Sequence, residues 1–159
     1  MPLGFEKHNH STCIKNALEA ADAFCARENL QFTKTRRRVL ELLLHKHKAL
    51  GAYDILATLD TEGLGSQPPV VYRALDFLVA NGFAHKIEKL NAYSACAHPG
   101  QSHIPVFMIC RACHAVAETR PKPLRGFLGA AAKSVDFIIE RTVIEAEGLC
   151  PTCQKALPA

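Results

Sequence analysis

The stretch PPVVYRALDFLVANGFAHKIEKLNAYSAC, residues 68–96, decides the fold of the first part of this chain. Two prolines lead into a segment in which Val71, Leu75 and Leu78 recur at helical spacing, and the turn residues Asn-Gly end it at 81–82. Two short alternating runs follow, joined by an asparagine. The stretch therefore predicts a helix and then an antiparallel hairpin.

Upstream of this stretch, apolar periodicity predicts three further helices, at 11–27, 34–47 and 52–62. Thr33 stands where it would cap the second of them. Three or four short helices followed by a hairpin are typical of a winged helix-turn-helix, in which the last helix enters the major groove of DNA. We therefore expect a DNA-binding domain over residues 1–96.

The charge of the chain is compatible with nucleic acid without establishing it. The net charge is +4 and the sequence pI is about 8.7. Basic residues crowd the first third of the chain, where they could also be a solvated helix face. These residues are Lys34, Arg36, Arg37, Arg38, His45, Lys46, His47 and Lys48. No apolar run approaches the roughly 20 residues of a membrane span, and the chain opens without a secretory signal, so we expect a cytoplasmic protein with no membrane partner.

The first exposed residues of the helix before the hairpin are the expected base readers. Arg73 can donate two hydrogen bonds to guanine, and Tyr72 can pack on a thymine methyl group or bind a phosphate. The alternative for Arg73 is a surface ion pair with Asp76. Arg36, in the earlier basic helix, is expected to lie along the phosphates.

The last third predicts a small second domain, residues 105–159, after a linker at 97–104. Its elements are expected strands at 105–110 and 115–120, a helix at 123–135 and a long alternating strand at 135–148. Such a β-β-α-β unit has too little core for a secure fold by itself, so metal and oligomerisation are expected supports.

Two Cys-x-x-Cys pairs, Cys110/Cys113 and Cys150/Cys153, bracket this domain. Four thiolates brought together make a closed tetrahedral zinc site with Zn–S bonds of about 2.3 Å. Two disulfides or four unliganded core thiols are the alternatives. A reducing cytosol disfavours the disulfides, so we expect one structural zinc site.

A second candidate ligand set draws residues from both domains. Its members are His85, Cys96, His103 and Glu118. Two imidazoles, a thiolate and a carboxylate suit tetrahedral zinc. Taken singly, each has an ordinary structural alternative, and His98 and His114 are rival ligands.

The chain resembles the ferric uptake regulator superfamily, and within it the zinc uptake regulator branch. The resemblance rests on four segments taken together: PPVVYRALDFLVANGFAHKIE, the hairpin ending in Cys96, FMICRACHAV and VIEAEGLCPTC. The resemblance covers roughly residues 11–155. It implies an α/β (α+β) fold with an N-terminal winged helix and a C-terminal dimerisation domain. It also implies a bacterial homodimer that binds double-stranded operator DNA, with zinc as corepressor at promoters of zinc-acquisition genes.

The resemblance also implies roles for single residues. The four cysteines match the structural zinc site, and His85, Cys96, His103 and Glu118 match the regulatory one, while Tyr53 and Arg73 match residues that touch DNA bases. Three features depart from the family: Thr33-Lys34-Thr35-Arg36 replaces the frequent Thr-Pro-x-Arg, the linker after Cys96 is one residue shorter than in some relatives, and HIPVFMIC replaces a histidine-rich stretch. The last departure predicts two zinc ions per subunit rather than three.

Two other classes of function remain. A zinc-dependent hydrolytic enzyme would need an open coordination position, which four protein ligands do not leave. The His-x-Glu and Pro-Cys-x-x-Cys signature of zinc deaminases is also absent. We therefore expect no enzyme and no small-molecule substrate. An iron, manganese or peroxide sensor of the same superfamily is the closer alternative.

Overall fold

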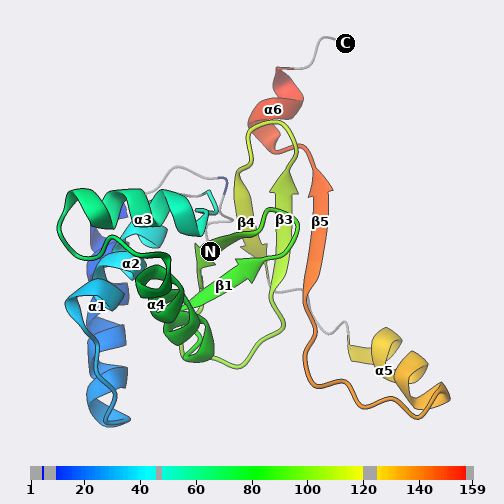
Figure 1. Cartoon of the computed structure of the whole chain (residues 1–159). Helices are drawn as coiled ribbons and strands as arrows, with labels where there is room; N and C mark the ends of the chain where they lie inside the picture. Colours follow the sequence, from blue (N-terminus) through cyan, green and yellow to red (C-terminus); the bar gives the residue numbers. More distant parts are fainter. Residues whose placement is uncertain (1–4, 6–9, 46–47, 120–124, 157–159) are drawn as a thin grey trace.

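The computed structural model describes residues 5, 10–45, 48–119 and 125–156. Four helices and a two-stranded hairpin form an N-terminal lobe, and a three-stranded sheet with two helices forms a C-terminal lobe (Figure 1). The N-terminal elements are α1 (His10–Arg27), α2 (Lys34–His45), α3 (Ala52–Thr61), α4 (Pro68–Ala80), β1 (Ala84–Ile87) and β2 (Ala92–Ala95). The C-terminal elements are β3 (Val106–Cys110), β4 (Val116–Thr119), α5 (Arg125–Ser134), β5 (Ile144–Gly148) and α6 (Pro151–Lys155). Among the described helices none is long and apolar enough to cross a membrane.

The helix ends follow the capping chemistry of the sequence. The Thr33 hydroxyl accepts a hydrogen bond from the Arg36 amide at 3.3 Å, which confirms the predicted cap of α2. Prolines occupy the first turn of α4, where their missing N–H groups cost nothing. At its other end Gly82 adopts φ +74°, a left-handed conformation that suits glycine, and the Phe83 amide returns to the Leu78 carbonyl at 2.8 Å.

The N-terminal core forms around α4. Val71, Leu75 and Leu78, the three positions predicted to face inward, are fully buried. They belong to one apolar cluster with residues of α1, α2 and α3. This packing fixes α4 relative to the earlier helices while its opposite face stays open to solvent.

The hairpin after α4 is the wing of the N-terminal lobe. β1 and β2 pair antiparallel from Ala84↔Ala95 to Ile87↔Ala92, and Asn91 in the turn takes a left-handed φ of +44°. The connector at 48–50, between α2 and α3, pairs with both lobes: Leu50 exchanges two 2.8 Å hydrogen bonds with Tyr93 of β2, and Lys48 bridges to Ala115 beside β4. The pairing of β1 with β2 directly after α4 confirms the predicted helix and hairpin.

The C-terminal sheet has the strand order β4-β3-β5, with β4 antiparallel and β5 parallel to β3. Phe107 on the central strand pairs with Glu118 on one side and with Glu145 on the other. Directly paired residues present their side chains on the same face of a sheet. We call Glu118, Phe107 and Glu145 the Phe107 row.

The long strand predicted at 135–148 is wrong in its first half. Only Ile144–Gly148 is strand, because β3 offers five residues for parallel pairing and the segment before them has no ladder partner among the described residues. Instead the chain turns after α5 at Asp136, whose φ is +54°. Residues 137–143 have no regular secondary structure. The predicted helix at 123–135 is α5, and its first two residues lie outside the described part.

A second apolar cluster joins the two lobes. Ile87 of the wing packs with Phe107, Ile109 and Val116 of the C-terminal sheet, and all four are buried. Ala49, Leu90 and Val143 pack around them. The wing is therefore seated on the sheet by hydrophobic contact, independently of any metal.

Leu78→Ala is expected to lower the free energy of unfolding by about 2–5 kcal/mol, because it opens a cavity in the N-terminal core. Leu78 is 0% exposed, whereas Leu30 is 37% exposed. The matched change Leu30→Ala should therefore cost less than about 1 kcal/mol. Urea unfolding followed by circular dichroism at one protein concentration measures both, and equal losses would contradict the described core.

Candidate metal centres and nucleic-acid interface

The four cysteines of the two Cys-x-x-Cys pairs meet at one end of the C-terminal sheet. Cys110 ends β3, Cys113 lies in the turn after it, Cys150 caps α6 and Cys153 lies within α6. Because β3 and β5 run parallel, with Cys110 opposite Gly148, their ends fall at the same edge. The four sulfur atoms lie within 4.8 Å of one another, and Cys113 Sγ is 3.7 Å from Cys150 Sγ.

Main-chain amides prepare this cluster for a cation. The Cys150 amide donates to Cys110 Sγ at 3.3 Å, and the Cys153 amide donates to Cys150 Sγ at 3.5 Å. The Cys150 and Cys113 amides lower the pKa of the Cys110 thiol to about 6. Hydrogen bonds with the Cys150 and Cys113 thiols raise the pKa of the Cys153 thiol. Four crowded sulfurs ionise together only when a cation compensates them, which is the chemistry of a closed tetrahedral metal site.

The second predicted ligand set also comes together, between the lobes. His85 lies on β1, Cys96 follows β2, His103 is in the linker loop and Glu118 lies on β4. Their donor atoms are all within 4.8 Å of one another. Cys96 Sγ is 3.7 Å from His103 Nε2 and 4.0 Å from Glu118 Oε1. Tetrahedral zinc with bonds of about 2.0–2.3 Å separates its ligands by about 3.3–3.8 Å. The two distances from Cys96 lie in or near this range, whereas His103 Nε2 and Glu118 Oε1, 2.6 Å apart, would move apart on binding such an ion.

The histidines are oriented as metal ligands would be. His103 Nδ1 lies 2.7 Å from the Gln101 carbonyl, which can only accept, so Nδ1 donates there and Nε2 is the ring atom that faces the cluster. His85 Nε2 is buried and makes no hydrogen bond to any described residue. It approaches Glu118 Oε1 at 3.3 Å, but off the hydrogen-bond direction. A cation among the four donors would satisfy this atom.

Glu118 is the charged member of the set. Burial by itself raises the pKa of this carboxyl, but the His85 imidazole, the Ala97 amide at 2.8 Å and the His103 imidazole at 2.6 Å outweigh burial and lower the pKa to about 2. The carboxylate is therefore ionised at neutral pH. The contribution of Ala97 could not be read from the sequence, because it comes from the main chain.

Neither rival histidine belongs to the ligand sets found among the described residues. His98 is buried beside the second cluster, where its ring centroid is 5.9 Å from that of His103 and its amide donates to Cys96 Sγ at 3.3 Å. His114 is exposed on the turn after Cys113 and has a left-handed φ of +58°. His98 therefore supports the thiolate through its main chain, and His114 remains at the surface.

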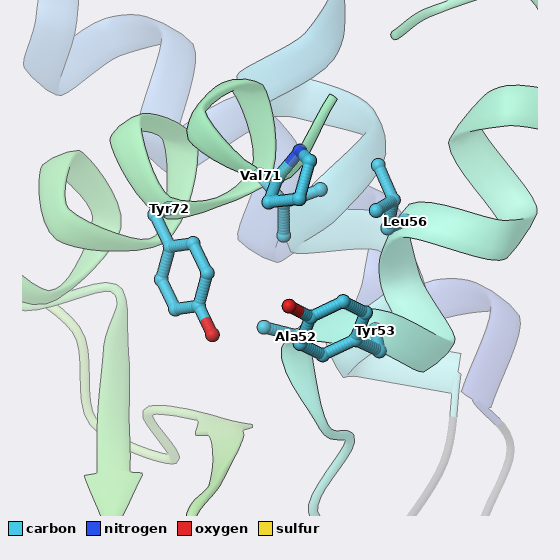
Figure 2. Close-up of a pocket in the computed structure, with 6 residues that line it drawn as sticks. Ala52, Tyr53, Leu56, Val71 and Tyr72 are labelled. Atoms are coloured by element: carbon cyan, nitrogen blue, oxygen red, sulfur yellow. The ribbon is translucent and has the colours of Figure 1, made fainter. Parts of the chain in front are cut away.

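Three of the four predicted DNA-contacting residues lie in the first halves of α3 and α4, and the fourth, Arg36, lies on α2. Tyr53 and Tyr72 are 69% and 39% exposed, and they flank a shallow apolar hollow that Ala52, Leu56 and Val71 help to line (Figure 2). Their two rings face across this hollow. The tyrosines therefore offer an apolar surface with hydroxyl groups beside it, which suits the edges of bases and their methyl groups.

The two predicted arginines differ in their surroundings. Arg73 is exposed on α4, and no ion pair to Asp76 is found in the described ranges. Arg36 is half-buried: its guanidinium donates to the Gln31 carbonyl and lies 3.8 Å from the centre of the Phe77 ring. Arg73 is therefore available to a duplex, while the guanidinium of Arg36 is held between α2 and α4.

Comparison with known proteins relates this chain to zinc uptake regulation proteins. No family model matches it. It is 37% identical over 143 residues to the zinc uptake regulation protein of Escherichia coli (strain K12), which covers 89% of this chain and 84% of that protein. It is also similar to a solved zinc uptake regulator complexed with zinc and DNA, at 36% identity and a TM-score of 0.86, covering 90% of this chain and 96% of that one.

Two structures of XcZur, one holo and one apo, allow the conformation of this chain to be compared with two forms of the same protein. The holo form matches at 37% identity with a TM-score of 0.78, covering 87% of this chain and 96% of that one. The apo form matches at 38% identity with a TM-score of only 0.50, covering 89% and 97%. Because the identities are nearly equal, the difference in TM-score reflects how the chains are arranged, and the arrangement of this chain is closer to the holo form than to the apo form.

Cys113→Ser is expected to remove one equivalent of zinc per subunit and to lower the midpoint of thermal unfolding by about 10 °C or more, because a structural metal supplies folding free energy. Cys13→Ser is the control, since Cys13 is exposed on α1 outside both clusters. Metal analysis and circular dichroism measure the two effects. Unchanged melting of Cys113→Ser would contradict a structural role for the cluster.

Proposed function

Because the chain belongs to the zinc uptake regulation protein family, we propose that it is a zinc-responsive transcriptional repressor in which zinc acts as corepressor. The observation that carries this proposal is the cluster of His85, Cys96, His103 and Glu118, whose donors come from the wing on one side and from the linker and the C-terminal lobe on the other. A ligand stabilises the arrangement of lobes for which it has the higher affinity. Zinc held by all four donors would thus favour the arrangement seen here.

The thiolate among the donors supports zinc over manganese, which prefers oxygen ligands. The two imidazoles suit iron as well as zinc, so Cys96 is the donor that favours zinc. Four protein donors also leave no open position for a reacting water, which disfavours a hydrolytic enzyme. The similar proteins reported above are regulators, in agreement with this reasoning.

We infer two zinc ions per subunit with different duties. The four-cysteine cluster is closed and rich in sulfur, so it should hold its ion tightly and stabilise the C-terminal lobe. The inter-lobe cluster must exchange a proton for metal at Cys96 and keep both imidazoles neutral. Glu118 is already ionised at neutral pH, so this ligand need lose no proton when zinc binds.

The metal-free cluster is already partly organised. His103 Nε2 and Glu118 Oε1 lie 2.6 Å apart, so Nε2 donates to the carboxylate when it carries a proton, and zinc would replace that proton and bind both atoms. The TM-scores with holo and apo XcZur support the idea that the arrangement of this chain corresponds to the zinc-loaded state. Zinc would then act by increasing the population of this arrangement rather than by building a new one.

For DNA, we propose that α4 enters the major groove with Arg73 and Tyr72, and that Tyr53 of α3 contacts bases beside it. Arg36 would contribute at the phosphates only with the N–H groups that Gln31 does not occupy, because its guanidinium is held at Gln31 and Phe77. Two copies in a homodimer would place two such helices on two half-sites of the operator, at promoters of zinc-acquisition genes. We propose a cytoplasmic location, where the chromosome of a bacterium lies.

The proposed function is tested by operator binding measured against buffered free zinc, with iron and manganese as controls. Wild-type protein should bind in a zinc-dependent way, and Cys96→Ser should remain a folded dimer whose binding no longer responds to zinc. Cys13→Ser should behave as wild type, since Cys13 lies outside the cluster. Operator binding that stays zinc-dependent in Cys96→Ser would show that the sensor lies elsewhere.

Arg73→Ala is expected to weaken operator binding at saturating zinc by about 1–3 kcal/mol and to relax the base preference, because a bidentate base contact is lost. Arg27→Ala removes the same charge at the end of α1 and should have little effect. Fluorescence anisotropy at fixed salt, with operator and scrambled duplexes, measures both variants. An unchanged sequence preference in Arg73→Ala would reject its role in base reading.

A further inference from the structure

The tip of the wing is bound to the C-terminal sheet by a carboxylate that none of the metal-site reasoning uses. Glu145 on β5 accepts the Glu88 amide with Oε1 at 2.6 Å and the Lys89 amide with Oε2 at 2.9 Å. Both donors belong to the turn at 88–91, the wing tip. Hydrogen bonds to an ionised acceptor are about twice as strong as neutral ones, so this contact is a specific attachment rather than incidental packing.

The Phe107 row explains why this attachment matters for the metal cluster. The row crosses the sheet below the wing, with Glu118 on β4, Phe107 on β3 and Glu145 on β5. At one end of the row Glu118 meets His85, and in the middle Phe107 packs in one cluster with Ile87 of β1. At the other end Glu145 holds the wing tip. The wing is therefore attached at three successive points.

The wing acts as a short lever between the tip and the metal cluster. The wing can pivot on its middle contact, Ile87 on Phe107. His85 lies two residues from Ile87, about 7 Å at roughly 3.3 Å per residue, so a tilt of roughly 10° moves His85 by about 1 Å, well beyond the ±0.2 Å within which metal–ligand distances are held. Fixing the tip restricts this tilt before any metal arrives.

We propose that Glu145 is a positioning residue of the zinc response. Its carboxylate holds the wing tip on β5 and so keeps His85 and Cys96 opposite His103 and Glu118. The inference rests on the proposed function for its biological meaning, but its physical content is the preorganisation of the cluster. Without Glu145, part of the binding free energy of zinc must order the wing, and the apparent affinity falls by the fraction of molecules in which the wing is out of place.

A neighbouring glutamate offers a matched control. Glu147 lies two residues further on β5 and pairs with the Lys89 side chain at 3.3 Å. Both groups of that pair are about half exposed, so the contact should contribute little. Glu147→Ala removes the same charge from the same strand while leaving both amide contacts of Glu145 in place.

The test compares full-length wild type, Glu145→Ala, Glu145→Gln and Glu147→Ala, each with its four-cysteine zinc intact. Amide hydrogen exchange of the segment 85–92 is measured without zinc in the inter-lobe cluster. The affinity of the zinc equivalent that Cys96→Ser lacks is measured by chelator competition. Glu145→Ala should exchange faster in this segment and need about tenfold more free zinc. Glu145→Gln, which keeps one acceptor oxygen, should fall between, and Glu147→Ala should stay within twofold of wild type.

Operator binding at saturating zinc separates positioning from general damage. It should change by less than twofold in Glu145→Ala, because zinc then supplies the missing order. Wild-type zinc affinity in Glu145→Ala would overturn the proposal, as would an equal loss in Glu147→Ala or an equal loss of operator affinity at saturating zinc. If Glu145→Ala does not fold, Glu145→Gln decides by the same criteria. Zinc-independent operator binding by wild type would instead overturn the proposed function, while the exchange and zinc affinities would still decide on Glu145.

Discussion

The seating of the wing on the Phe107 row is the interaction on which the rest of this structure depends. Phe107 is fully buried on the central strand, and its partners on the two neighbouring strands are both glutamates. These two carboxylates have different roles. Glu118 completes a metal cluster at the base of the wing, and Glu145 binds its tip. A slip of β3 by one residue against its neighbours would turn Phe107 to the other face of the sheet, away from the wing and from both carboxylates.

The two clusters are coupled through the same short strand. Cys110 lies three residues after Phe107 on β3, so the end of this strand belongs to the four-cysteine cluster while its middle supports Glu118 through β4. A metal that stabilises the sheet therefore also stabilises the scaffold of the inter-lobe cluster. The proposed division of labour, with one ion retained and the other exchanged, follows from the donors: sulfur alone in the first, and a mixture spanning two lobes in the second.

Local chemistry made much of this arrangement predictable. The Thr33 cap, the inward stripe of α4 and the hairpin after it follow from side-chain periodicity and turn residues, and the structure confirms them. The structure also brings both predicted ligand sets together, although their roles in binding metal stay predictions. The strand at 135–148 was wrong because alternation marks a strand only where a partner exists, and β3 pairs with five residues. The contact of Glu145 with amides 56 and 57 positions away has no sequence signal, since any residue supplies an amide.

The connector at 48–50 has a consequence for how the molecule can move. It forms one β-bridge to the wing, between Leu50 and Tyr93, and another to the C-terminal lobe, between Lys48 and Ala115. Because the connector contacts both lobes, a movement of one lobe away from the other must break a main-chain bridge. The same movement exposes the apolar cluster between the wing and the C-terminal sheet. Intermediate arrangements should therefore be poorly populated, and each subunit should switch between two states. A graded response in a cell would then come from averaging over many molecules.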